Sequence, residues 1–549
     1  MMTEKHTGAS LLAAAIKSAE TLVFGMVGGH NLVIFAELQK AGVPFYQGRH
    51  EQGAGFMAEG YGRLTGAAPV LLTTAGPGIT NVVTPIAQAY AESVPMVVLA
   101  VDNYASTIAT PMGRFHGIPD LQSILSPIST WMGTADSPEE LYRLVRRALN
   151  PAEHNRPMPR VIHVPSNVLA ATAMEPVAPE GEEDLADDAS LDGDVDRLLE
   201  LLAQAERPVI LAGAGSVRAQ AAQQVQDLAE RLHAPVVTTV QARGLIPDDH
   251  ALAAGTIWDR YASLDGLAAE ADLTLCLGTS LSPLATRDGT LPLKNIFQVD
   301  LAEPLRATTY EDRQVARQDV KRFVERLLER LSDGLKTQGV AESYARKVKQ
   351  ASQDRWVRLT ERSPIVAGLL EGIREASPRE TVFSCDMTMF GYWAQRFLPV
   401  HTPGGLLSPY YFGTLGYGIP AAIGAAIAKP GQPVVALCGD GGALMNFQEF
   451  AAVQRFGVPV HAVVFNDSAF GAMRADVRRQ GTGEVDVVDL WNPDFADLAR
   501  AYGLQYAQTG PQGADVRGAL SKQIEKNAPS LLEVKISDEI PIFYEVDLR

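Results

Sequence analysis

The chain has 549 residues, of which 46% are hydrophobic and 20% charged, and its net charge is −17. This length predicts about three or four domains, and the composition is typical of a globular protein. The acidic balance argues against nucleic acid or an anionic membrane surface as the main partner.

The three cysteines, Cys276, Cys385 and Cys438, each lie in an apolar run, and no CxxC spacing occurs. This sparse, odd set predicts reduced buried thiols and neither a disulfide framework nor a zinc site. Residues 1–17 lack the basic and apolar regions of a secretory signal, and no run of about 18 apolar residues predicts a membrane-spanning helix. We therefore expect a cytoplasmic protein.

Residues 1–175 alternate between helix and strand patterns, which predicts an N-terminal α/β domain with a parallel, doubly wound sheet. One predicted strand ends at Gly28-Gly29-His30, where Asn31 can cap the next helix. A later strand, 69–74, leads into a Gly76-Pro77-Gly78 turn.

Glu51 lies just beyond a predicted strand, at the start of a Gly/Ala-rich helix over residues 52–65. The small residues of this helix allow another backbone to pack closely, as at a subunit or domain interface. A partly desolvated carboxylate at that position can relay protons near neutral pH. The alternative is an acid at a helix N-terminus that the helix dipole stabilises. The residues alone slightly favour this alternative.

Residues 176–196 form an acidic stretch that predicts a solvated linker, and residues 197–335 again alternate strands and helices. In this central α/β domain Gly213-Ala214-Gly215 follows a strand, which suggests a dinucleotide site. The full GxGxxG is absent, however, and Asp300 lies far beyond the spacing expected for the ribose-binding acid. A structural α/β domain is therefore favoured over a nucleotide-binding one. Residues 336–361 predict a helical linker.

The third domain, residues 362–549, contains a strand at 434–438, the loop Gly439-Asp440-Gly441-Gly442, a helix at about 444–456 and a strand at 458–465 that leads to Asn466. Neighbouring parallel strands joined by a right-handed crossover present their carboxyl ends to one crevice. An acid, an amide and a loop carbonyl there suit Mg²⁺ or Ca²⁺ carrying a phosphate ester. The alternative is an ordinary turn followed by a helix cap.

A Gly-Asp-Gly followed 26 residues later (440 to 466) by Asn resembles the diphosphate–metal motif of thiamine diphosphate-dependent enzymes. The family often has Asn-Asn where this chain has Asn466-Asp467. The resemblance implies Mg²⁺ held by Asp440, Asn466 and the main-chain carbonyl of Ser468.

Residues 48–61 closely match the acetolactate synthase branch of that family, and residues 74–81 resemble the turn that follows there. The resemblance implies that Glu51 hydrogen-bonds N1′ of the aminopyrimidine. Residues 412–422 resemble the segment that bends the cofactor, with Leu415 between its two rings and the Gly413 carbonyl on its 4′-amino group. From the pattern alone, Leu415 is more simply a core leucine.

The cofactor-binding residues expected from this resemblance are Gly76, Asn81, Gly413, Leu415, Gly439, Asp440, Gly441, Gly442, Asn466, Ser468, Phe470 and Gly471. The family's geometry pairs Glu51 of one subunit with Asp440 of another. A homodimer or homotetramer with shared active sites is therefore implied.

Such cofactors add to a 2-oxo acid, CO₂ leaves, and an enamine remains. Protonation of the enamine gives an aldehyde, and attack on a second carbonyl gives a carboligase product. His30 and His116 are the candidate proton donors because each lies in a loop on the expected cofactor side, although a single histidine is more often a surface or core residue. His50, which precedes Glu51, is a third imidazole.

The downstream segment departs from acetolactate synthases, because residues 470–478 lack the Trp that selects their acceptor. The flavin-site signatures are not recognisable either, so FAD is not expected but stays open. The Gly113–His116 loop with His30 looks more like the branch that includes 5-guanidino-2-oxopentanoate decarboxylase. We therefore expect a 2-oxo acid decarboxylase, with a carboligase as the alternative. Two further hypotheses, less favoured by the sequence, are a nucleotide-dependent oxidoreductase and a non-catalytic binding protein.

Overall fold

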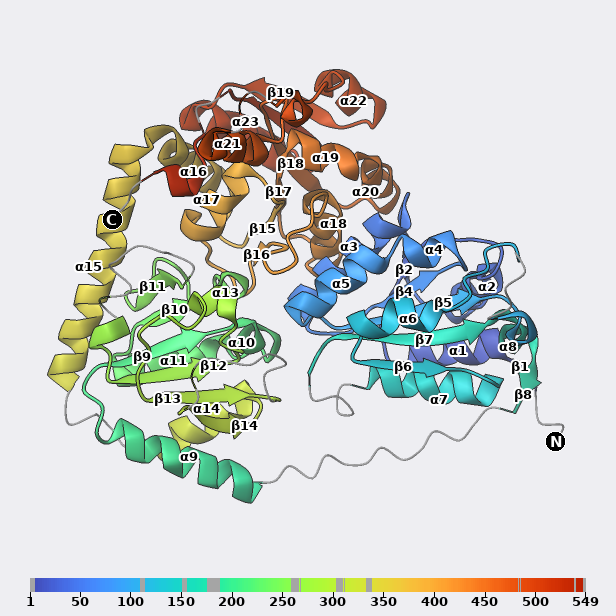
Figure 1. Ribbon diagram of the computed structural model, residues 1–549, viewed down its shortest axis with the longest axis horizontal. Coiled ribbons are helices and arrows are strands. Elements are labelled where there is room, and N and C mark those ends of the chain that lie inside the picture. The colour runs from blue at the N-terminus through green and yellow to red at the C-terminus, as the bar shows by residue number, and fades with distance from the viewer. Residues whose placement is uncertain are drawn as a thin grey trace. The chain divides into compact units, whose positions relative to one another are not determined.

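The computed structural model describes residues 5–108, 114–150, 156–174, 188–257, 266, 268–302, 310, 312–331, 338–481, 483, 485–537 and 540–546. Within these residues the chain forms three six-stranded sheets in which every strand pairing is parallel (Figure 1). The predicted architecture of three doubly wound α/β domains is confirmed. Gly113 and the acidic residues 180–187 lie outside the described residues.

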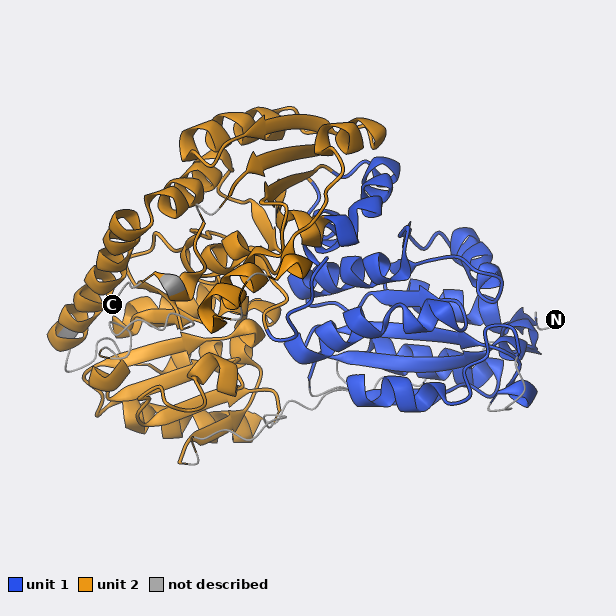
Figure 2. Cartoon of the chain, turned by 45° about the horizontal axis from the view of Figure 1, so that its top comes forward, with its two compact units in different colours: residues 1–185, 411–430, 444–458 blue, residues 186–410, 431–443, 459–549 orange. Residues whose placement is uncertain are grey.

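The chain divides into two compact units (Figure 2). The first unit comprises residues 1–185 together with two later segments, 411–430 and 444–458. Its sheet has the order β3-β2-β4-β5-β7-β6. The strands are β2 (Val23–Gly25), β3 (Phe45–Gln47), β4 (Val70–Thr73), β5 (Met96–Asp102), β6 (Trp131–Thr134) and β7 (Pro159–Pro165).

Helices cover both faces of this sheet because its strands are apolar on both sides. Three of them, α1 (Gly8–Ser18), α2 (Leu32–Ala41) and α7 (Pro138–Leu149), share one buried core with the strands. In addition, α3 (Glu51–Thr65) packs on α5 (Val83–Glu92) and on α18 (Gly418–Ala428). The close approach predicted for the Gly/Ala-rich helix is thus made by α18 of the same chain.

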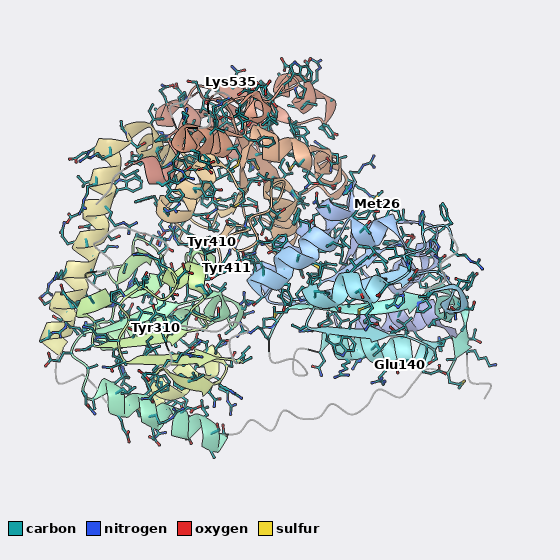
Figure 3. The ribbon with its side chains drawn as sticks, viewed as in Figure 1. Met26, Glu140, Tyr310, Tyr410, Tyr411 and Lys535 are labelled. Carbon is teal, nitrogen blue, oxygen red and sulfur yellow. The ribbon has the colours of Figure 1, made fainter. Side chains whose placement is uncertain are left out.

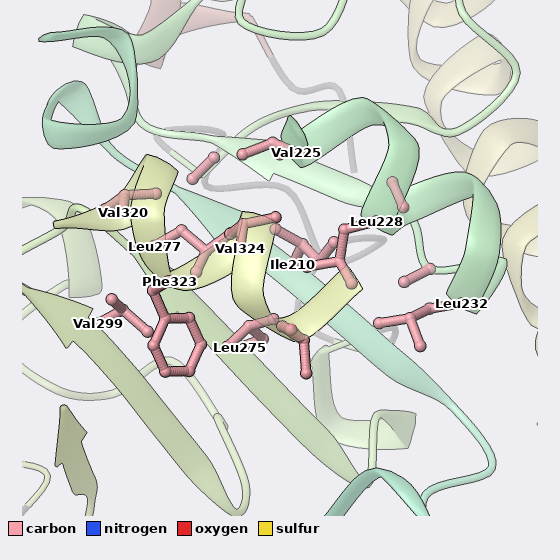
Figure 4. Close-up of a cluster of buried hydrophobic side chains, with 14 of the residues drawn as sticks. Ile210, Val225, Leu228, Leu232, Leu275, Leu277, Val299, Val320, Phe323 and Val324 are labelled. Atoms are coloured by element: carbon pink, nitrogen blue, oxygen red, sulfur yellow. The ribbon is translucent and has the colours of Figure 1, made fainter. Parts of the chain in front are cut away.

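The second unit comprises residues 186–410, 431–443 and 459–549 and holds two sheets. The central sheet has the order β11-β10-β9-β12-β13-β14. Its strands are β9 (Pro208–Ala212), β10 (Val236–Thr238), β11 (Ala253–Thr256), β12 (Leu273–Leu277), β13 (Ile296–Asp300) and β14 (Gln314–Arg317). Side chains of α11 (Ala222–Leu232) and α14 (Val320–Arg330) pack on the strands in one apolar core (Figure 4). Two further helices of the chain are α9 (Asp188–Leu202) and α15 (Gln338–Arg362).

The C-terminal sheet has the order β16-β15-β17-β18-β20-β19. Its strands are β15 (Val382–Cys385), β16 (Leu406–Leu407), β17 (Val434–Gly439), β18 (Val460–Asn466), β19 (Gln505–Thr509) and β20 (Ser530–Lys535), whose last residue is labelled in Figure 3. The helices around it include α16 (Pro364–Ala376), α17 (Met389–Phe397), α21 (Gly471–Gln480), α22 (Phe495–Ala501) and α23 (Gly513–Glu525).

The helix predicted at about 444–456 is wrong as a single element. The chain forms α19 (Asp440–Met445), a 3₁₀ turn η5 (Phe447–Glu449) and α20 (Phe450–Phe456). Asn446 interrupts the helix because its side-chain amide donates to the Gly416 carbonyl, at 2.7 Å.

The three buried cysteines are free thiols, as predicted. In the part of the chain that the structure describes, no helix combines the length and apolarity that a membrane crossing needs.

Candidate active site

Glu51 is the first residue of α3, and its Oε2 accepts a hydrogen bond from Asn81 Nδ2 at 3.0 Å. Asn81 ends the short helix α4 (Pro77–Thr80) that follows β4. His50 is the N-cap of α3, and its Nδ1 accepts from the backbone N–H of Gln52 at 3.1 Å. The structure therefore gives His50 a capping role and ties Glu51 to the side-chain amide of Asn81.

Glu449 is an acid that the sequence pattern did not single out. Its carboxylate accepts from the backbone N–H groups of Arg49 and His50, each at 2.9 Å. Burial raises the pKa of Glu449 to about 7, against the lowering effect of these two hydrogen bonds. The residue belongs to the 444–458 segment, which packs within the first unit. Glu449 thus fixes the backbone directly before Glu51.

His30 follows β2 and has a partner on each ring nitrogen. Its Nε2 lies 3.3 Å from Asn103 Oδ1, and its Nδ1 lies 3.5 Å from Thr74 Oγ1. Asn103 Nδ2 donates to the Phe115 carbonyl at 3.1 Å, so the amide oxygen faces the imidazole. The two partners therefore fix the orientation of the imidazole.

Asn31 builds the turn before His30 and, as predicted, stands at the N-cap of α2, but its side chain bonds within the turn. Asn31 Oδ1 accepts from the Gly28 N–H at 2.7 Å, and Nδ2 donates to the Met26 carbonyl at 3.1 Å. Its side chain makes no capping bond to α2. Asn31 thus shapes the loop that carries His30.

His116 lies beside His30, with ring centroids 5.5 Å apart, and stacks on Phe115 at 3.9 Å. Its φ is +62°, and its backbone fits tightly over Gly76, where an added Cβ would lie 2.8 Å from the His116 carbonyl oxygen. His116 Nδ1 is buried without a hydrogen-bond partner among the described residues.

The loop from Thr74 to Asn81 thus collects the three candidate catalytic residues. Thr74 contacts His30, Gly76 contacts His116 and Asn81 binds Glu51. All these residues belong to the first unit.

A buried pair supports this arrangement from behind. Asp102 Oδ2 lies 2.9 Å from His163 Nε2, and Asp102 Oδ1 accepts from the Asn103 N–H at 2.7 Å. Sequence reasoning missed Asp102, Asn103 and His163. The signal available was their place in or after the apolar strands β5 and β7.

Buried polar contacts hold the segment that carries Gly413 and Leu415. The Tyr417 hydroxyl donates to Glu59 Oε2 at 2.6 Å, and Glu59 is also paired with Arg63. The Tyr411 N–H donates to Glu92 Oε1 at 2.8 Å. These contacts join residues 411–417 to α3 and α5. Leu415 is half-buried, and Gly413 is exposed with a φ of +74°.

In the second unit, Asp440 and Asn466 come together at the carboxyl ends of the adjacent strands β17 and β18. Asn492, which the sequence did not predict, contacts both. Its Nδ2 donates to Asp440 Oδ2 at 2.6 Å and to Asn466 Oδ1 at 3.1 Å. Burial raises the pKa of Asp440, and the Asn492 bond works against this rise.

Asn466 is oriented by a buried acid on β20. Its Nδ2 donates to Glu533 Oε1 at 2.5 Å, and the Tyr506 hydroxyl donates to Glu533 Oε2 at 2.6 Å. This leaves Asn466 Oδ1 facing Asn492. The Ser468 N–H also donates to that oxygen at 3.1 Å. Ser468 has a φ of +51°, and its carbonyl accepts from the Leu490 N–H at 2.7 Å.

The Gly439–Gly442 loop has little room for side chains. An added Cβ on Gly439 would lie 2.8 Å from Thr388 Oγ1, and one on Gly441 would lie 2.8 Å from the Phe470 ring. On Gly442 it would lie 3.0 Å from Asp386 Oδ2. The predicted residues Gly439, Gly441, Gly442 and Phe470 therefore lie close together. Gly471 lies next to Asp467, where an added Cβ would be 2.5 Å from the carboxylate.

The donor set at Asp440 fits a hard cation. Asp440 Oδ2 and Asn466 Oδ1 both accept a hydrogen bond from Asn492 Nδ2, so these two oxygens face the same point. Carboxylate and amide oxygens are suitable ligands for such a cation. No cluster of three His, Cys, Asp or Glu side chains suited to a metal occurs among the described residues. A cation here would accordingly need amide, carbonyl and phosphate oxygens. Asp467 adds charge, and burial together with Asp440 raises its pKa to about 6.

In the central domain, by contrast, the Gly213-Ala214-Gly215 turn packs on the chain itself. An added Cβ on Gly213 would lie 2.3 Å from the Gly278 carbonyl oxygen, and the Gly215 N–H donates to that oxygen at 2.9 Å. Close backbone packing accounts for these glycines.

Three family profiles match the chain in order. They are the N-terminal thiamine pyrophosphate (TPP) binding domain over residues 6–124, the central domain over 195–327 and the C-terminal TPP binding domain over 386–534. A probable 2-ketoarginine decarboxylase of Pseudomonas aeruginosa is 35% identical over 90% of this chain and 87% of its own length. A probable acetolactate synthase large subunit of Methanocaldococcus jannaschii is 29% identical (95% and 91% covered), and an Escherichia coli acetolactate synthase isozyme 2 large subunit is 27% identical (94% and 93%). The chain therefore belongs to the thiamine pyrophosphate enzyme family.

Proposed function

We propose that this protein is a thiamine diphosphate- and Mg²⁺-dependent 2-oxo acid decarboxylase that releases an aldehyde. The observation that carries the proposal is the meeting of Glu51, His30 and His116 at the Thr74–Asn81 loop. Two histidines that contact the loop that also holds Glu51 provide proton donors. Release of an aldehyde needs a proton at the carbon that lost CO₂, whereas carboligation needs one at the oxygen of the acceptor carbonyl.

Bound thiamine diphosphate supplies the carbon nucleophile that adds to the 2-oxo acid and lets CO₂ leave. Glu51 exchanges a proton with the pyrimidine ring nitrogen, while Asn81 holds its other oxygen in place. Protonated His30 delivers a proton to the carbon that lost CO₂. Asn103 Oδ1 and Thr74 Oγ1 lie 3.3 and 3.5 Å from its two ring nitrogens and hold the ring in place. His116 lies over the same loop and orients the substrate.

The diphosphate end is proposed to bind at the Gly439–Gly442 loop through Mg²⁺ held by Asp440, Asn466 and the Ser468 carbonyl. Glu533 supports the proposal because it turns the oxygen of Asn466 toward Asp440. Phe470 and Gly471 flank this loop, and Gly413 and Leu415 hold the bend of the cofactor. We further propose a cytoplasmic homodimer or homotetramer in which Glu51 and Asp440 of different subunits form each site.

The substrate is proposed to be a 2-oxo acid such as 5-guanidino-2-oxopentanoate, because one relative is a probable 2-ketoarginine decarboxylase. The test incubates the purified protein with thiamine diphosphate, Mg²⁺ and a panel of 2-oxo acids, and measures CO₂ and products by NMR. The expected result is one aldehyde per CO₂, with His30→Asn lowering aldehyde release about 100-fold or more.

The second candidate is a carboligase, which the acetolactate synthase relatives favour. The same reaction with two 2-oxo acids present distinguishes the candidates. An acetohydroxy acid as the sole product would overturn the decarboxylase proposal and leave the carboligase.

A further inference from the structure

Asn492 contacts both side chains proposed to hold the cation, but the two ends of its amide group differ in their hydrogen bonds. Nδ2 donates to Asp440 Oδ2 at 2.6 Å and to Asn466 Oδ1 at 3.1 Å. The other end of the amide, Oδ1, is buried and has no hydrogen-bond partner among the described residues. A buried acceptor without a partner is unfavourable, so this arrangement calls for an explanation.

The orientation of the amide follows from the charges that it faces. Asp440 and Asn466 both present acceptor oxygens, so only the N–H₂ end of Asn492 can face them when nothing lies between. A divalent cation between these oxygens reverses the preference. It repels the N–H₂ group and attracts Oδ1, because hard cations bind carbonyl oxygens.

The distances also suit a position in a coordination shell. Oxygen ligands that lie next to each other around an octahedral Mg²⁺ are roughly 3 Å apart, given metal–oxygen distances of about 2.1 Å. Asn492 Nδ2 lies 2.6 Å from Asp440 Oδ2 and 3.1 Å from Asn466 Oδ1. It therefore occupies a place that a neighbouring ligand would take.

The backbone on both sides fixes Asn492 at this place. On one side the Leu490 N–H donates to the Ser468 carbonyl at 2.7 Å, and the Phe470 N–H donates to the Val488 carbonyl at 2.8 Å. On the other side, the Asp494 carboxylate caps α22 through the N–H groups of Ala496 and Asp497. The loop thus holds Asn492 over Asp440 independently of a cation.

We propose that Asn492 is a further protein group of the cation site. Its amide turns over when the cation binds and presents Oδ1 to it, as a ligand or through one ligating water. Without the cation, Nδ2 holds Asp440 and Asn466 together in the arrangement that the ion requires. This inference rests on the proposed function, because it assumes that the Asp440 site takes a divalent cation.

The experiment titrates Mn²⁺ into the full-length apoprotein with saturating thiamine diphosphate and measures free Mn²⁺ by electron paramagnetic resonance. Asn492→Ala and Asn492→Leu remove the oxygen and should weaken Mn²⁺ binding about 10- to 100-fold. Asn492→Asp keeps an oxygen and adds charge, so it should bind Mn²⁺ at least as tightly as the parent.

The thermal midpoint gives a second measurement that does not depend on activity. Asn492→Asp places two carboxylates together, so its apoprotein should melt below the parent, and Mn²⁺ should raise its midpoint by more. Asn527→Gly is the matched control, since Asn527 is an exposed residue with a φ of +49° that glycine adopts without strain. It should leave Mn²⁺ binding unchanged.

Equal Mn²⁺ affinity in the parent and in the Ala and Leu variants would overturn the role of Asn492, as would weaker binding by Asn492→Asp. A parent protein that binds no Mn²⁺ in the presence of thiamine diphosphate would overturn the proposed cation site itself. The two failures are therefore distinguishable.

Discussion

The two outer sheets share one strand order, and the central sheet has another. Numbered within each domain, the N-terminal and C-terminal sheets both run 2-1-3-4-6-5, whereas the central sheet runs 3-2-1-4-5-6. In each order the chain changes direction beside its first strand, and ligands bind at such a point in doubly wound sheets. In the outer domains the loop after the third strand lies at this point. It is the Thr74–Asn81 loop in one and the Gly439–Gly442 loop in the other.

The loop after the third strand therefore carries polar residues in both outer domains. In the N-terminal domain it holds Glu51, and in the C-terminal domain it contains Asp440. In the central domain the point of reversal lies between β9 and β12, and there Gly213 and Gly278 pack backbone against backbone. This is the strand order of dinucleotide-binding domains. Here the turn after the first strand packs against Gly278 of the turn after the fourth strand. Strand order locates a candidate site, and the side chains at that location decide whether it is one.

Glu51→Gln should have the largest effect on rate. The amide keeps the hydrogen bond to Asn81 but no longer exchanges a proton, so kcat should fall by about 10²- to 10⁴-fold. Cofactor affinity, measured by isothermal titration calorimetry, should change little. A variant with parental kcat would contradict the proposed proton exchange by Glu51.

Asp440→Ala tests the equivalent loop of the C-terminal domain. Removal of the carboxylate should lower Mg²⁺-dependent cofactor affinity by at least about 100-fold. The measurement is cofactor retention after gel filtration with and without Mg²⁺. Asp497→Ala, an exposed acid of α22, serves as the control and should retain the cofactor. If Asp440→Ala retains the cofactor as the parent does, the Gly439–Gly442 loop is not a cofactor-binding counterpart of the Thr74–Asn81 loop.

Gly213→Ala tests the central domain. Its Cβ would lie 2.3 Å from a backbone oxygen, which cannot move aside as a side chain can, so unfolding free energy should drop by about 3 kcal/mol. Urea denaturation measures this loss. Cofactor affinity of the folded variant should equal that of the parent, and a selective loss of affinity without a stability change would contradict the structural role.

The outer domains each bury a histidine in a strand, and the two side chains have different partners. His163 in β7 is paired with Asp102, whereas His461 in β18 contacts the Ser530 hydroxyl, at 2.9 Å. Burial lowers the pKa of His461 to about 4, below its ordinary value of 6.5. The stabilising contribution of neutral His461 is therefore complete above pH 6.5 and is lost as the pH falls toward 4.

Between pH 7 and pH 5 this loss should amount to about 2 kcal/mol. Thermal midpoints across that range measure it. His461→Asn should flatten the acid side of the profile. An unchanged slope in His461→Asn would assign the acid sensitivity to other groups.

The sequence was sufficient for the architecture because strand and helix patterns are local. It placed the strands that end at His30, Asp440 and Asn466, and the structure has β2, β17 and β18 there. It could not find Asn103 or Glu533, because each acts through a partner on another strand. Spacing along the chain carries no record of such contacts.

The helix at 444–456 was predicted as continuous for a related reason. Its interruption depends on the contact of Asn446 with Gly416, thirty residues away. Asn492 was missed because it follows the second strand of the motif by 26 residues and lies in a loop with no pattern of its own.

The packing of residues 411–430 and 444–458 in the first unit limits how this enzyme can be taken apart. A Cβ on Gly60 would meet the Ala421 carbonyl oxygen at 2.4 Å, so the N-terminal region is fitted to a helix encoded more than 350 residues later. Chimeras that graft residues 1–185 from a relative should therefore also carry that relative's 411–458 stretch. Conversely, a truncated 1–185 fragment would leave the small-residue side of α3 bare and is a poor choice for expression.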